Sequence, residues 1–124
     1  MRFALDLHDS EVRDVAMHGS EVRIRFAAAS VRDLRGVRGW LQGVTLVMAE
    51  ARLAGDTAHA FGRLAEGQLS QDGRAIVRPA LPATLAGELA LTLRFANGTR
   101  LGAHGSSLAL GLADDFKFTE DLSC

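Results

Sequence analysis

The chain has 124 residues, of which 48% are hydrophobic and 23% are charged, and its formal net charge is -1. This balance is that of an ordinary globular domain, and the length suits one domain with its own core. A nearly neutral chain is not attracted as a whole to nucleic acid or to an anionic membrane, so we expect neither as a partner.

The sequence contains one cysteine, Cys124. One cysteine cannot form an internal disulfide, and no CxxC pair is present for redox chemistry or zinc binding. Residues 1–6 mix charged and apolar side chains, unlike a signal peptide, and no apolar run approaches the ~20 residues of a membrane helix. We therefore expect a cytoplasmic protein.

The N-terminal segment alternates apolar and polar residues, with Phe3, Leu5 and Leu7 on one face, which predicts a half-buried strand. Gly19 and Ser20 then predict a two-residue hairpin turn. This turn fixes a register in which both faces are consistent: Met17 opposite Val22, Val15 opposite Ile24, and Asp14 opposite Arg25. Val12 falls out of phase, so we expect a bulge near Arg13.

Residues 29–40 have the composition of a long loop, in which Ser30 could cap a short helix ending at Arg38. On such a helix Arg32, Arg35 and Arg38 would share one side and could hold a phosphate or an acidic partner. The alternative is a solvated loop. Trp40, which follows, is expected either to plug the core or to anchor an interface.

A second hairpin is expected at Gly55-Asp56. Its inner face would consist of very small residues: Ala49, Ala51, Ala58, Ala60 and Gly62. Such a face lets another layer approach closely or leaves room for a ligand.

Three further turns are expected in the C-terminal half. Asp72-Gly73 sets Leu69 opposite Ile76, and a three-residue loop at 96–98 sets Leu93 opposite Leu101. A fifth turn is expected at Gly105-Ser106. Residues 89–95 alternate as a strand, whereas residues 78–87, with two prolines, are expected to form a long loop.

About nine short strands joined by tight turns predict an all-β fold, a single β-domain over residues 1–124. We expect an antiparallel up-and-down meander that closes into a small barrel or flattened barrel, because closure removes the exposed sheet edges. A β-sandwich is the alternative.

The run His8-Asp9-Ser10 contains the residue types of a nucleophilic hydrolase. Adjacent residues on an extended chain point in different directions, however, and Asp and Ser are favoured in turns because they bond nearby backbone groups. We therefore assign no catalytic residue. The four histidines have no metal-ligand spacing, so no metal and no cofactor are expected.

Two groups of residues are candidate ligand contacts. Asp6 and His8 share a strand face, and His104 is expected at a turn, so these three could meet at the mouth of a barrel. In the expected register Arg94 lies opposite Arg100, which is unfavourable unless an acid such as Asp114 or Asp115, or a bound anion, compensates.

The stretch Leu7-His8-Asp9-Ser10, followed by Val12 and by a hairpin that ends in Ile24-Arg25-Phe26, resembles the opening of small bacterial β-proteins of uncharacterised function. The resemblance covers about a fifth of the chain. It implies a compact β-domain and carries no activity.

Two functions fit these features. The first is a small non-enzymatic binding or protein-interaction module, whose partner is a second copy of the chain or another protein. The alternative is a small-ligand carrier or a small enzyme with its site in or at the mouth of the barrel. A purely structural accessory domain is a third class that the sequence does not distinguish from the first.

Overall fold

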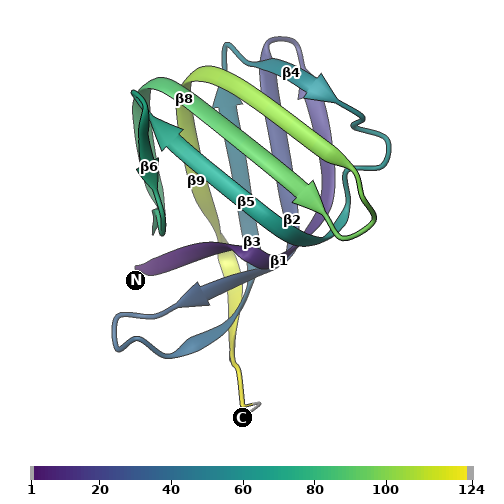
Figure 1. Cartoon of the computed structure of the whole chain (residues 1–124). Helices are drawn as coiled ribbons and strands as arrows, with labels where there is room; N and C mark the ends of the chain where they lie inside the picture. The colour runs from purple at the N-terminus through teal and green to yellow at the C-terminus, as the bar shows by residue number, and fades with distance from the viewer. Residues whose placement is uncertain (1, 123–124) are drawn as a thin grey trace.

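The computed structural model describes residues 2–122 (Figure 1). Within that range every regular element is a strand, and no helix there is able to cross a membrane. The strands are β1 (Phe3–His18), β2 (Glu21–Arg32), β3 (Arg38–Ala49), β4 (Arg52–Gly55), β5 (Gly62–Gln71), β6 (Arg74–Ile76), β7 (Ala80–Leu81), β8 (Ala83–Phe95) and β9 (Arg100–Glu120).

All strands belong to one antiparallel sheet in the order β6-β5-β8-β9-β3-β2-β1-β7, with β4 also paired to β9. A short additional pairing joins β1 to β5, at Glu11–Arg63 and Val12–Gly62, so that six strands form a closed ring. The ring is not a regular barrel. The predicted all-β, antiparallel, roughly nine-stranded fold is therefore confirmed. Strands that are consecutive in the chain pair with each other in β1–β2, β2–β3 and β8–β9. The pairings of β3 with β9 and of β5 with β8 bring together strands that are not consecutive.

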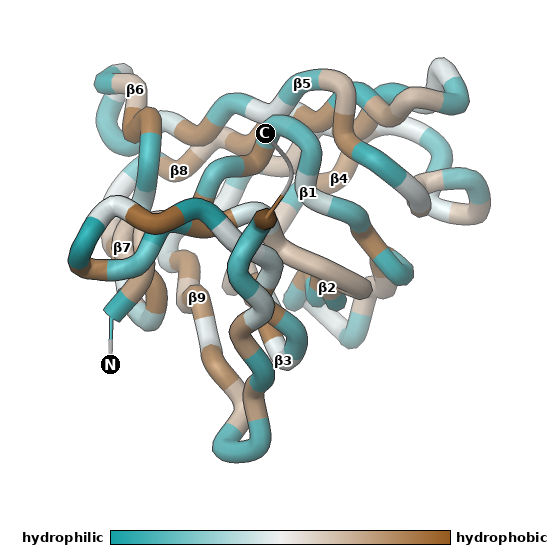
Figure 2. The backbone as a smooth tube through the Cα atoms, turned by 90° about the horizontal axis from the view of Figure 1, so that it is seen from below, coloured by the Kyte–Doolittle hydropathy of each residue, from teal (hydrophilic) through white to brown (hydrophobic). Residues whose placement is uncertain are grey.

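The core follows from the period-two alternation of the strands, which is visible as alternating colours along the tube in Figure 2. The residues expected to face inward at the N-terminus and in β8 are all buried: Phe3, Leu5, Leu7, Leu89, Leu91, Leu93 and Phe95. The far end of the β2–β3 hairpin and the C-terminal end of β9 extend away from the ring (Figure 1).

Three of the five expected turns are confirmed with their registers. The first hairpin has all three predicted cross-strand pairs and loses register between Val12 and Asp14, which is the expected bulge at Arg13. The third hairpin pairs Leu69 with Ile76. The loop at 96–98 has three residues, with Gly98 at a φ of 91°, and pairs Leu93 with Leu101.

The expected turn at Gly105-Ser106 is wrong, because β9 continues through it. Gly105 instead allows a close approach between strands: a Cβ there would collide with the side chain of Met48 on β3. His104 consequently lies in the middle of a strand, not at a hairpin tip.

The expected hairpin at Gly55-Asp56 is also wrong. β4 pairs with β9, and residues 56–61 form a loop that leads to β5. The predicted face of small residues does not form, because both Ala58 and Ala60 lie in that loop, where Ala58 is exposed and Ala60 is buried.

Two segments expected as loops contain strands. β2 and β3 run through residues 29–40, leaving only a turn in which the Asp33 carboxylate accepts hydrogen bonds from the backbone N–H of Arg35 (2.9 Å) and of Val37 (3.0 Å). Ser30 is buried in β2 and caps no helix. Residues 78–87 contain β7 and the start of β8.

Candidate functional site

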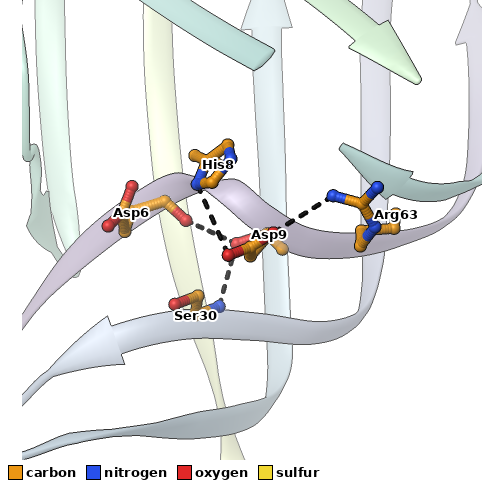
Figure 3. Close-up of polar contacts among 6 residues, drawn as sticks. Asp6, His8, Asp9, Ser30 and Arg63 are labelled. Carbon is orange, nitrogen blue, oxygen red and sulfur yellow. Dashed lines mark hydrogen bonds and ion pairs between the residues drawn. The ribbon is translucent and has the colours of Figure 1, made fainter. Parts of the chain in front are cut away.

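A wide irregularity in β1 shapes the candidate site. Asp6 pairs with Ser30 and Glu11 pairs with Ala28, so four residues of β1 (7–10) face a single residue of β2. Ser10, which is fully buried, bridges the gap: its Oγ donates to the Asp6 carbonyl oxygen (2.6 Å) and accepts from the Ser30 N–H (2.8 Å) (Figure 3). A side-chain hydroxyl thus satisfies backbone groups that the interrupted ladder leaves unpaired.

Asp9 completes this bulge. Its φ of 69° lies in the left-handed region, which Asp adopts more readily than most residues. Its carboxylate contacts Arg63 Nη1 on β5 at 3.1 Å and His8 Nδ1 at 3.4 Å (Figure 3). The turn-forming interpretation of His8-Asp9-Ser10 is the one supported by the structure, because the Ser10 hydroxyl is buried and already engaged.

The bulge forms one wall of an open groove between β1, β5, β6 and β8, with a volume of about 390 Å³. We call it the β1–β5 groove. Its lining combines apolar and hydrogen-bonding side chains: Asp6, Leu7, His8, Gly67, Gln68, Leu69, Ser70, Ala75, Ile76, Val77, Ala90 and Thr92. Asp6 and His8, which the sequence predicts on one strand face, both line this groove.

His104 does not meet Asp6 and His8 in the β1–β5 groove. It lies between two shallower depressions on the outer face of the sheet. One, of about 430 Å³, includes Ser70 and Glu88, and the other, of about 370 Å³, includes Glu50 and Arg52. The sequence did not predict that Glu50, Glu88 and Arg52 lie beside His104, because their proximity depends on long-range strand pairing.

Arg94 and Arg100 lie opposite each other, as predicted. The compensating acid is not Asp114 or Asp115 but Glu66 on β5, which pairs directly with Arg94 and whose Oε1 is 3.1 Å from Arg94 Nη2. The register of β5 on β8 was not predicted, so Glu66 was missed. This acid accounts for the arginine pair without a bound anion.

The segment that carries Arg32, Arg35 and Arg38 is a hairpin turn between β2 and β3, so these arginines do not share the side of a helix. Arg35 pairs with the Asp33 carboxylate at 3.1 Å, and Arg32 donates to the Gly36 carbonyl oxygen at 3.4 Å. Arg38 lies opposite Arg32 across the hairpin.

Trp40 is half-buried within β3, between its sheet neighbours Ser30 and Thr119, and is not part of the buried core. A fully buried core plug is therefore excluded, and the role of interface anchor stays a prediction.

Within residues 2–122 no group of three or more His, Cys, Asp or Glu side chains is placed to hold a metal ion. Comparison of the chain with protein-family models, with curated proteins and with solved structures found no match, so the resemblance to small bacterial β-proteins stays a prediction.

Proposed function

We propose that the protein is a non-enzymatic binding module and that the β1–β5 groove is its binding site. The observation that carries this proposal is the groove itself. Its volume of about 390 Å³ is in the range of ligand sites, and apolar side chains and a few polar groups converge on it.

The apolar part of the groove offers binding energy. Val77, at its margin between β6 and β7, is 80% exposed, although its neighbours in the groove Leu7 and Leu69 are buried. Covering a valine side chain contributes roughly 1.5 kcal/mol or more. Asp6, Gln68 and Thr92 supply hydrogen-bonding groups that would orient the ligand.

The alternative, a small enzyme or ligand carrier, has less support. Ser10, the hydroxyl residue of the His8-Asp9-Ser10 run, is buried and bonded to backbone groups on both sides. A carrier of small molecules would use the same groove without a reaction. The partner of such a module is a second copy of the chain or another protein. A reducing compartment such as the cytoplasm is proposed on the cysteine usage.

The proposal is tested by screening a library of small fragments with ¹⁵N NMR. Binders should shift the amides of Gly67, Gln68 and Ile76. Ala75→Trp, which places a large ring in the groove, should abolish those shifts, whereas Ala109→Trp, at an exposed position of β9 outside the groove, should retain them. Shifts that survive Ala75→Trp, or no shifts at all, would refute the β1–β5 groove as the site.

A further inference from the structure

The β1–β5 groove is one end of a longer feature. It shares Ser70 and Ala90 with the first of the two His104 depressions, and these two depressions share His104 and Gly105. The three therefore form one continuous trough across the outer face of the sheet. Its axis follows a row of directly paired residues on β5, β8, β9 and β4: Ser70, Ala90, His104 and Arg52.

Local breaks in the sheet border the part of this trough that surrounds His104. On one side of β9 the pairing with β8 loses register between Ala86 and Leu89. On the other side the chain leaves β3 after Ala49 and returns to β9 only at Arg52, with the intervening Glu50 at a φ of 51°. β9 thus has an irregular neighbour on each side at the level of Gly105 and Ser106.

The charges along the trough are mostly negative. Asp6, Glu88 and Glu50 lie in its three parts, against the single guanidinium of Arg52. Across residues 2–122 the structure gives none of these four side chains a hydrogen bond or ion pair. With both histidines neutral, the lining carries a net charge of -2, which favours a cationic ligand.

The shape of the trough suits an extended chain. Four strands spaced ~4.8 Å apart span roughly 14 Å, the length of about four residues of extended polypeptide. No Phe or Trp ring lines any part of the trough, whose aromatic side chains are the imidazoles of His8 and His104.

Building on the proposed function, we propose that the trough binds a short, extended, basic segment of another protein, with its cationic side chains directed at Asp6, Glu88 and Glu50 and its apolar side chains at the β1–β5 groove. Specificity comes from charge and from the small floor residues Ser70 and Ala90, because larger side chains there would close the trough.

The test uses two fluorescein-labelled hexapeptides, one alternating lysine with valine and the other alternating glutamate with valine, measured by fluorescence anisotropy at low salt. The lysine peptide should bind at least tenfold more tightly. Glu50→Gln and Glu88→Gln should each weaken its binding about threefold, as expected for a partly exposed ion pair. Glu120→Gln, the same change on β9 but outside the trough, should have no effect.

Equal binding of the two peptides, or equal loss with Glu120→Gln, would overturn the basic-segment proposal. So would a lysine peptide that fails to bind while fragments still shift Gly67, Gln68 and Ile76, and in that case the proposed function would stand. Absence of both peptide and fragment binding would overturn the two proposals together.

Discussion

Leu7 lies directly against the backbone of Gly67: a Cβ built on Gly67 would be 2.6 Å from the Leu7 Cβ. The glycine is therefore required because β1 crosses β5 closely at this point, at the base of the candidate site. No turn is involved.

Gly67→Ala should consequently destabilise the fold by about 1–3 kcal/mol, the usual cost of overpacking, and should shift the amides of the bulge at residues 7–10. Urea denaturation measures the loss. Gly102→Ala is the matched control, because the nearest atom to its new Cβ, the Ala54 carbonyl oxygen, is 4.0 Å away. Equal stability of the two variants would contradict the close contact.

Ser10→Ala should cost about 1–3 kcal/mol, because it leaves the buried Ser30 N–H without its acceptor and removes the bond to the Asp6 carbonyl. Thermal or urea unfolding gives the value. Ser106→Ala, at an exposed position, should change stability by less than ~0.5 kcal/mol. A neutral Ser10→Ala would show that the hydroxyl does not support the bulge.

The backbone conformation of Asp9 makes a second prediction for the same bulge. Both Asp9→Gly and Asp9→Ala lose the ion pair with Arg63, but only alanine retains a Cβ at a φ of 69°. Asp9→Ala should therefore be less stable than Asp9→Gly by roughly 1 kcal/mol in urea denaturation. The reverse order would mean that this residue is not in the left-handed region in solution.

Hydrogen bonds from Arg25 Nε (2.9 Å) and Nη2 hold the pKa of Asp14 below its ordinary value of 3.8. Since the folded pKa is the lower one, this pair stabilises the fold above about pH 3.8, and the contribution is lost as the pH falls through the folded value. Arg25→Gln should raise the pKa of Asp14 towards 3.8 in a carboxyl ¹³C NMR titration. Asp33, in the β2–β3 turn, should titrate unchanged, and an unmoved Asp14 would contradict the assignment.

Glu66→Gln should leave Arg94 and Arg100 facing each other without compensation. We expect a loss of a few tenths of a kcal/mol at low salt that shrinks with added sodium chloride, because exposed charges are screened. Adding Arg100→Gln to Glu66→Gln should recover most of the lost stability. A double-mutant cycle measures the coupling, and full additivity would exclude it.

The sequence predicts those parts of the fold whose determinants are local. Gly19-Ser20, Asp72-Gly73 and residues 96–98 are turns whose register is set by adjacent residues, and these registers are correct. The turn predicted at Gly105 is wrong because a glycine that permits close strand approach looks the same in the local sequence as a turn glycine. Only its contact with Met48, which is distant in the chain, distinguishes the two.

For the candidate site, too, the sequence predicts only what local residues determine. The alternation of β1 places Asp6 and His8 on one face, and the structure puts both in the β1–β5 groove. Their neighbours Gln68, Val77 and Thr92 come from strands whose order in the sheet does not follow the chain, so no local pattern indicates them.

The length of β9 has a consequence for biosynthesis. This strand pairs with β3, β4 and β8, all of which leave the ribosome before it. Because chains emerge at ~5–20 residues per second, the edges of β3 and β8 that await β9 stay uncovered for a second or more, during which they are available to aggregate. Slow translation would lengthen that interval, so expression yield should depend on how soon the codons for β9 are read after those for β8.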